Sequence, residues 1–536
     1  MIKIIIMTLL TALRNHFKLI LLLPLIGLLL ACSRPSITVH TELGEVEGYS
    51  QNGDHYFLGI PYAKPPVAEN RWQPPQPVEP WQGVKKALGF KPGCPQGSKV
   101  TGVFVASEDC LYLNITRPAA ESVGLRPVMV WLHGGSFEIG AGSEHQYNPT
   151  NLAKRSDVIV VTINYRMGVF GFFSLPELSA ESSYGGSGNY FLMDQAMALR
   201  WVHDNIESFG GDPNNVTLFG ESAGGSSTCL NLTSPLSKGL FQRAIIQSGA
   251  CTQATTSLPE AEQDGVAIAD MVGCTEDRLN CLRSKSAAEL RQLIDAAAGQ
   301  SSPFGDTVNK HSLVLDNYVF IDEPMAMLES GFQADVPVII GVNQNEGSLF
   351  SGDEFPQNEA EYMAYLAAEF PGNAQAVAAL YPLSHYSKPA NAVADIVGDR
   401  WFICPAKKSA QAMVTGGQDV YFYYFTSSVQ GPLKTLIKFM NGPSGPDAGI
   451  YHSSEIPFVF GINSFLGFLS EDGVTISHQM MQQWKALALN GNPNTEGVPY
   501  WPQFNLATED YLEINTPVYT GTYFMKEKCD YWASVE

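Results

Sequence analysis

The stretch that decides the fold reads Val216-Thr217-Leu218-Phe219-Gly220-Glu221-Ser222-Ala223-Gly224-Gly225, within a chain of 536 residues. Its first four residues form an apolar run typical of a buried strand. Glycines on both sides of Ser222 then indicate a tight turn from that strand into a helix, which exposes the serine hydroxyl. A glycine-rich loop with an incidental serine is the alternative, but the preceding strand favours the turn. Ser222 is therefore a candidate nucleophile.

Similar apolar runs recur along the chain and predict further buried strands. They cover residues 128–132, 158–163, 244–247, 336–340 and 420–424. Helical patterns lie between several of them, for example over 194–205. This alternation predicts an α/β fold with a large, mostly parallel central sheet flanked by helices. Ligands of such sheets bind at the carboxyl ends of the strands, so the residues after each run are candidates for a functional site.

The segment His133-Gly134-Gly135-Ser136-Phe137 directly follows the predicted strand 128–132. Glycines in such a loop allow backbone N–H groups to turn toward one point, as an oxyanion hole requires. The N–H of Ala223, the residue after the candidate nucleophile, supplies a further donor. We interpret His133 itself as a packed, hydrogen-bonded loop residue and not as a base.

A serine nucleophile also needs an acid and a histidine, which follow the serine in that order when the serine stands on a turn of this kind. Glu346 comes shortly after the predicted strand 336–340, at the edge where Ser222 lies, whereas Asp335 precedes that strand. For the base we favour His452, which lies in the segment 449–458. The other histidines considered are interpreted as solvent-exposed or structural: His311, His385 and His478.

The N-terminus has the pattern of an export signal. Residues 1–31 contain three basic side chains and no acid, and residues 19–30 form an apolar run broken only by one proline and one glycine. A basic flank, a short apolar core and a small residue before the cut are typical of a secretory signal. An uncleaved membrane anchor is the alternative, but the run is short for one.

Cys32 directly follows the predicted cut, in Leu29-Leu30-Ala31-Cys32-Ser33, which resembles a bacterial lipobox. We therefore expect a lipoprotein-type signal peptide over 1–31 and lipidation of Cys32. The resulting membrane anchor, in the outer membrane, would face the periplasm or the cell surface. We expect residues 32–536 to form a single domain.

Composition narrows the class of protein further. Hydrophobic residues make up 45% of the chain and charged residues 16%, which is typical of a globular protein. The formal net charge of −21 repels phosphate backbones, so we expect no nucleic-acid partner. Nine cysteines suit an oxidising compartment. We see no clustered ligand set for a metal and expect no cofactor.

With these motifs in place, the chain resembles the type-B carboxylesterase family, which includes cholinesterases and bacterial para-nitrobenzyl esterases. The likeness runs from about residue 40 almost to the C-terminus. Besides the segments around Ser222, Glu346 and His452, it is carried by Phe57-Leu58-Gly59-Ile60-Pro61-Tyr62-Ala63, Arg71-Trp72, Ser107-Glu108-Asp109-Cys110-Leu111-Tyr112-Leu113-Asn114, Asn164-Tyr165-Arg166, Asn189-Tyr190, Asp194-Gln195 and Phe209-Gly210-Gly211-Asp212-Pro213.

The resemblance implies an α/β-hydrolase fold with loop and helical insertions over the active site. It implies a serine carboxylic-ester hydrolase that needs no cofactor and acts through a Ser222–Glu346–His452 triad. The oxyanion hole would use the N–H groups of Gly135, Ser136 and Ala223, although many members have glycine in place of Ser136. The expected substrates are small to medium carboxylic esters.

The resemblance also suggests structural contacts. It implies the disulfides Cys94–Cys110, Cys274–Cys281 and Cys404–Cys529, and an ion pair between Arg71 and Glu108. Cys229 and Cys251 lie outside the pattern, and a bridge between them is only a guess.

Alternatives for the function remain at this point. Cholinesterases carry a tryptophan in the loop closed by the first disulfide, but residues 95–109 contain none. Choline esters, which need that cation–π partner, are therefore not the expected substrates. A lipase or amidase of different specificity, and a catalytically silent adhesion or binding protein on the same fold, are the other readings.

Overall fold

A computed structural model describes residues 34–96, 106–297, 312–332, 334–350, 355–428, 432–462 and 469–535. The predicted signal peptide over 1–31 and the predicted lipidation site Cys32 lie outside these ranges. No helix among the described residues is both long and apolar enough to cross a membrane.

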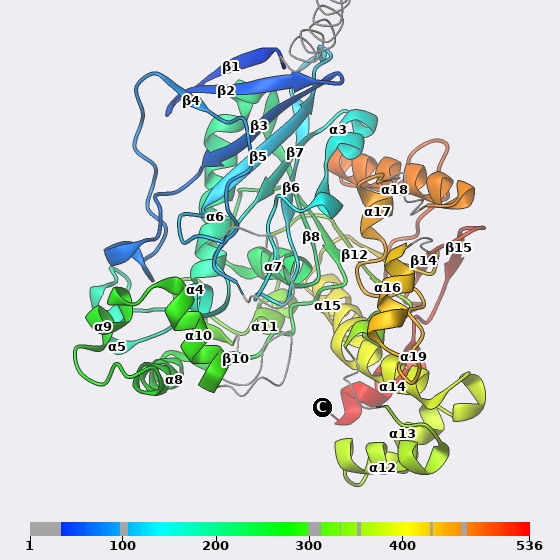
Figure 1. Ribbon diagram of the computed structural model, residues 1–536. Coiled ribbons are helices and arrows are strands. Elements are labelled where there is room, and N and C mark those ends of the chain that lie inside the picture. Colours follow the sequence, from blue (N-terminus) through cyan, green and yellow to red (C-terminus); the bar gives the residue numbers. More distant parts are fainter. Residues whose placement is uncertain are drawn as a thin grey trace, which may run out of the picture.

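One sheet of thirteen strands runs through the molecule (Figure 1). Seven neighbouring strands, in the order β7-β6-β8-β9-β12-β13-β14, run parallel. Antiparallel pairs extend the sheet through β5, β3, β2 and β1 on one side and through β15 on the other, and β4 pairs with β2. The strands are β1 (Ser36–Thr41), β2 (Gly44–Gln51), β3 (Asp54–Pro61), β4 (Val84–Lys86), β5 (Tyr112–Pro118), β6 (Arg126–Leu132), β7 (Ile159–Ile163), β8 (Gly211–Glu221), β9 (Arg243–Gln247), β12 (Val338–Asn343), β13 (Val420–Phe425), β14 (Tyr511–Ile514) and β15 (Tyr519–Gly521). A separate two-stranded sheet pairs β10 (Thr255–Ser257) with β11 (Leu313–Leu315).

Strand β6 shows why both faces of the sheet are covered. Successive side chains of a strand point to opposite faces. Accordingly, Val128 and Val130 join one apolar cluster, while Met129 and Trp131 join another. The first cluster includes residues of α6 (Tyr190–Asn205), α7 (Ala223–Thr233) and α15 (Cys404–Thr415), and the second includes residues of α3 (Thr150–Ser156) and α18 (Glu471–Asn490). Figure 1 shows α6 on one side of the sheet and α18 on the other.

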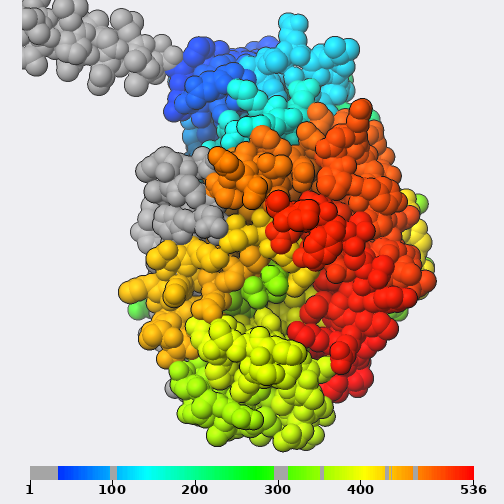
Figure 2. Space-filling model, turned by 90° about the vertical axis from the view of Figure 1, so that its right-hand side faces the viewer, coloured from blue at the N-terminus to red at the C-terminus, as the bar shows by residue number. Residues whose placement is uncertain are grey.

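Helical insertions lie beyond the carboxyl ends of the parallel strands. One group packs around its own apolar cluster and contains α12 (Glu359–Glu369), α13 (Ala374–Leu380), α14 (Pro389–Gly398) and α19 (Lys526–Val535). Figure 2 shows the first three of these helices forming the lower end of one face of the molecule. The remaining helices in the described ranges are α4 (Gly168–Phe172), α5 (Pro176–Glu181), α8 (Leu258–Met271), α9 (Arg278–Ser284), α10 (Ala287–Ala297), α11 (Pro324–Glu329), α16 (Pro432–Met440) and α17 (Ile456–Val459).

The structure confirms the predicted fold class: an α/β protein with a large parallel sheet and helices on both faces. Each predicted strand is present, with small shifts in its ends. The strand predicted over 336–340 begins at Val338, because Pro337 has no N–H to donate to the sheet. The other strands of the main sheet are additions to the prediction: β1, β2, β3, β4, β5, β14 and β15.

Candidate active site

Ser222 stands between β8 and α7 in a strained conformation. Its φ of 57° and ψ of −124° lie far from both strand and helix values. The turn requires glycine around it, because a Cβ on Gly224 would lie 2.0 Å from the carbonyl oxygen of Leu132. The N–H of Ser222 donates to the carbonyl oxygen of Gln247 at 2.9 Å. The serine is partly exposed, whereas its neighbours Glu221 and Ala223 are buried.

Glu346 and His452 meet beside this turn. Glu346 is fully buried directly after β12, and its Oε2 lies 2.5 Å from Nδ1 of His452. The other carboxylate oxygen, Oε1, accepts hydrogen bonds from the hydroxyl of Ser248 and the N–H of Asn343, both at 2.6 Å. Both oxygens of Glu346 are therefore occupied, which fixes the carboxylate and, through Nδ1, the orientation of the imidazole.

The second ring nitrogen of His452, Nε2, lies 3.1 Å from Oε1 of Glu221. Among the described residues there is no hydrogen bond from His452 to Ser222. Burial alone would lower the pKa of His452, but the charges of Glu221 and Glu346 outweigh it and raise that pKa to about 9. Burial raises the pKa of Glu221 to about 8 despite the neighbouring imidazolium. The titrations of Glu221 and His452 are therefore coupled and take place above neutral pH.

A third buried carboxyl group, Glu455, lies three residues after His452, directly before α17. Its Oε1 accepts a hydrogen bond from the side-chain amide of Gln247 at 2.9 Å, and its Oε2 accepts one from the amide of Asn343. Burial nevertheless raises the pKa of Glu455. Two aromatic rings enclose the imidazole, with Phe402 at 4.4 Å and Phe350 at 5.0 Å between ring centroids.

The loop after β6 approaches the nucleophile closely. A Cβ on Gly134 would lie 3.0 Å from Cβ of Ser222. Gly135 has a φ of 112°, and Ser136 and Phe137 have φ values of 55° and 58°, so the backbone turns sharply here. Within the described ranges, neither Gly135 nor Ser136 donates its N–H to another residue. Ala223 is the first residue of α7, where N–H groups have no partner within the helix.

His133 is placed as expected for a packed loop residue. Its ring stacks on Tyr165, with 4.4 Å between centroids, and its Nδ1 lies 2.9 Å from the carbonyl oxygen of Gly134. Burial lowers the pKa of His133 to about 4, so the ring is neutral at physiological pH.

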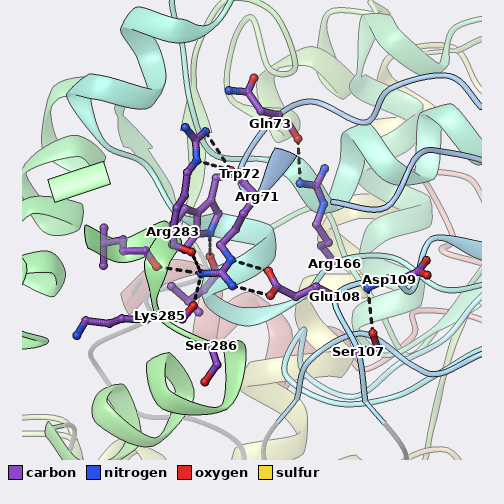
Figure 3. A network of polar contacts seen from close by, with 12 residues as sticks. Arg71, Trp72, Gln73, Ser107, Glu108, Asp109, Arg166, Arg283, Lys285 and Ser286 are labelled. Carbon is purple, nitrogen blue, oxygen red and sulfur yellow. Dashed lines mark hydrogen bonds and ion pairs between the residues drawn. The ribbon is translucent and has the colours of Figure 1, made fainter. Parts of the chain in front are cut away.

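Four disulfides brace the described part of the chain. They join Cys94 to Cys110, Cys274 to Cys281, Cys404 to Cys529 and Cys229 to Cys251. The Arg71 guanidinium donates to both carboxylate oxygens of Glu108 at 2.6 Å (Figure 3). It also donates to the carbonyl oxygens of Leu282 and Lys285. Because this places the pair in a saturated network, Arg71 and Glu108 act as structural groups.

Several polar groups around His452 were not predicted as site residues. Ser248 directly follows the apolar run 244–247, so its place at the carboxyl end of a buried strand was a usable signal. No sequence signal of this kind marks Glu455 or the contact between Glu221 and His452. Both depend on how the backbone turns at Ser222 and at His452 direct the neighbouring side chains. Among the described residues, no group of three or more His, Cys, Asp or Glu side chains has an arrangement that could hold a metal ion.

Comparison with known proteins extends the resemblance. The pattern of the carboxylesterase family matches residues 35–532. Para-nitrobenzyl esterase from Bacillus subtilis is 36% identical over 496 residues, which cover 90% of this chain and 95% of the esterase. Fumonisin B1 esterase from Sphingopyxis macrogoltabida is 36% identical over 488 residues, covering 88% and 85%.

A solved PNB esterase structure superposes with a TM-score of 0.78 at 34% identity, covering 93% of this chain and all of the other. The architecture is therefore the α/β-hydrolase fold. With its strand order, the turn at Ser222 and a match over nearly its whole length, the chain belongs to the carboxylesterase family and is a carboxylesterase.

Proposed function

We propose that this esterase acts through a Ser222–Glu346–His452 triad and an acyl-enzyme intermediate. The observation that carries the proposal is the 2.5 Å contact between Glu346 and Nδ1 of His452, beside the strained turn that presents Ser222. With a carboxylate on Nδ1, Nε2 is the ring nitrogen that would act as the base, and Glu221 lies 3.1 Å from it.

The proposed reaction has two steps. In the first, Nε2 of His452 takes the hydroxyl proton as the oxygen of Ser222 attacks the ester carbonyl carbon. The N–H groups of Gly135, Ser136 and Ala223 stabilise the oxyanion, and the imidazolium returns its proton to the departing alcohol. In the second, His452 takes a proton from water, which attacks the acyl-enzyme and releases the acid and free Ser222.

The proposed substrates are small to medium carboxylic esters. Phe350 and Phe402 pack against the imidazole, so we propose that their rings line the substrate site and favour acyl groups of limited size. The names of the relatives agree with this class, since one hydrolyses para-nitrobenzyl esters and another an ester of fumonisin B1. A lipase should instead prefer emulsified long-chain esters.

A labelling experiment tests the proposal. Purified protein lacking residues 1–32 is treated with a fluorophosphonate, the labelled peptide is mapped by mass spectrometry, and hydrolysis of a para-nitrophenyl ester series is measured. We expect the label on Ser222 and the fastest turnover on short acyl chains. Ser222→Ala should lower turnover by about 10⁴-fold or more. A label on another residue, or near-native turnover of the variant, would overturn the triad.

The catalytically silent alternative has a distinct outcome in the same experiment. A folded, disulfide-intact protein that neither reacts with the fluorophosphonate nor hydrolyses any ester of the series would favour a binding protein. The presence of serine, acid, histidine and oxyanion-loop glycines together argues against that outcome.

We also propose that Cys32 carries a lipid anchor in the outer membrane. Arg34, the first described residue, is only two positions further along, so the anchor would hold the fold close to the bilayer near β1. Figure 1 shows β1 at one end of the molecule and α7, which begins directly after Ser222, well away from it. An anchored enzyme would therefore keep its active site open to water. Cys32→Ser should abolish lipid labelling and release the protein from the membrane fraction, and unchanged fractionation would refute the anchor.

A further inference from the structure

The disulfide Cys229–Cys251 lies outside the family pattern and joins the helix that follows Ser222 to a loop that contacts Glu346. Cys229 is on α7, seven residues after Ser222, and Cys251 is three residues after Ser248. Both cysteines are fully buried. The bridge therefore links the helix of the nucleophile to the loop that supplies a hydrogen bond to Glu346.

We propose that this disulfide positions the candidate acid: it holds Ser248 against Glu346 and so keeps the Glu346 carboxylate in place relative to Ser222. The proposal rests on the triad proposed above. Cys229 and Cys251 touch no reacting atom, and they act through Ser248.

Ser248 needs such support because its backbone is strained. Its φ of 49° lies in the left-handed region, which is costly for a residue with a side chain and persists only where the surroundings enforce it. Its N–H donates to the carbonyl oxygen of Gly341 at 2.8 Å, and its hydroxyl donates to Oε1 of Glu346 at 2.6 Å. If the loop relaxed toward an ordinary φ, the hydroxyl would turn away from Glu346.

The loop is pressed directly onto α7. A Cβ on Gly249 would lie 2.4 Å from the backbone nitrogen of Ser226, so the two backbones are nearly in contact. The hydroxyl of Ser226 accepts hydrogen bonds from the N–H of Ala250 at 3.3 Å and from the amide of Gln253 at 2.8 Å. These hydrogen bonds are few and one is long, and the disulfide is the covalent tie that maintains the close approach.

The effect on catalysis follows from this geometry. Without the Ser248 hydroxyl, Glu346 keeps the N–H of Asn343 and the imidazole of His452, so the triad is loosened rather than abolished. A displacement of catalytic groups by about 1 Å can cost about 10²-fold in rate. We therefore expect kcat to fall by about 10- to 100-fold with KM nearly unchanged.

A double-mutant cycle tests the proposal. The variants are C229A/C251A, S248A and their combination, with C274A/C281A as the matched control because its bridge joins the turn after α8 to α9. Turnover of para-nitrophenyl acetate is measured per active site titrated with a fluorophosphonate, so that loss of folded protein does not count as loss of kcat. Thermal unfolding is recorded for each variant.

We expect C229A/C251A and S248A to lose similar amounts of kcat, and their combination to lose no more than about twofold beyond S248A alone. The control should lose thermal stability but keep its kcat. An unchanged kcat in C229A/C251A, or losses that multiply in the combination, would overturn the proposal. If C229A/C251A does not fold, C229V/C251A replaces it, because valine fills more of the volume that the two sulfur atoms leave. The same changes in kcat are then expected for that variant. An inactive wild type would instead refute the proposed mechanism.

Discussion

Glu221→Gln should change the pH dependence of this esterase, because Glu221 lies 3.1 Å from the nitrogen of His452 that we propose as the base. The imidazole must be neutral to accept the serine proton, so activity rises with pH through the pKa of His452. Against the effect of burial, Glu221 and Glu346 raise that pKa to about 9. Since the variant lacks the charge of Glu221, its pKa and the rise in activity should both lie lower.

The magnitude follows from the distance. An opposite charge within about 4–6 Å shifts a pKa by about 1–3 pH units, so the acidic limb of kcat/KM should move down by about that much. The same charge also stabilises the imidazolium that forms as Ser222 attacks. The plateau rate at high pH should therefore fall, by at most about tenfold for each pH unit that the limb moves.

The assay is kcat/KM for para-nitrophenyl acetate between pH 5 and about 10, corrected for spontaneous hydrolysis at high pH. Glu221→Asp is the matched control, because it keeps the charge and should retain more of the raised pKa. A limb that stays in place in Glu221→Gln would show that Glu221 does not control the protonation of His452. This result would refute the electrostatic effect of Glu221 on His452, but it would not contradict the proposed triad.

Three further changes test the structure around the site. Gly224→Ala would place a Cβ 2.0 Å from the carbonyl oxygen of Leu132, so denaturant unfolding should show a loss of about 1–3 kcal/mol or more together with reduced turnover; wild-type behaviour would contradict the geometry of the turn. Arg71→Ala leaves the partly buried Glu108 without its cation and should cost up to about 3 kcal/mol, with kcat per titrated site unchanged if the pair is only structural. Removing Cys404–Cys529, which spans 125 residues, should cost about 5 kcal/mol on chain entropy, against about 2 kcal/mol for Cys274–Cys281, which spans 7; equal losses in calorimetry would contradict this ranking.

The parts of the fold that the sequence predicts are those set by local pattern. The strand and turn around Ser222 follow from an apolar run and glycines, and β6, β9 and β13 follow from similar runs. The antiparallel strands β1 to β3 escape prediction because residues 36–61 mix polar, glycine and apolar residues without a clear period. Their pairing depends on the rest of the sheet, which no local window contains.

The candidate site divides in the same way. The sequence segments around Ser222, Glu346 and His452 are sufficient to predict these three residues. The structure brings Glu346 and His452 into contact. The bridge from Cys229 to Cys251 could not be derived, because cysteine spacing does not fix connectivity. The contact of Glu221 with His452 depends on the side-chain direction imposed by the strained turn, which no sequence pattern specifies.

Three buried carboxyl groups around one imidazole raise the question of which of them remains uncharged. Glu346 accepts hydrogen bonds from Ser248 and Asn343, and Glu455 accepts them from Gln247 and Asn343. In the described part of the chain, Glu221 has only the imidazole of His452 as a polar partner. Because donors stabilise a buried carboxylate and neighbouring carboxylates oppose it, Glu221 is the group that takes up a proton most readily. This agrees with its pKa of about 8 and makes Glu221 the group through which pH controls the base.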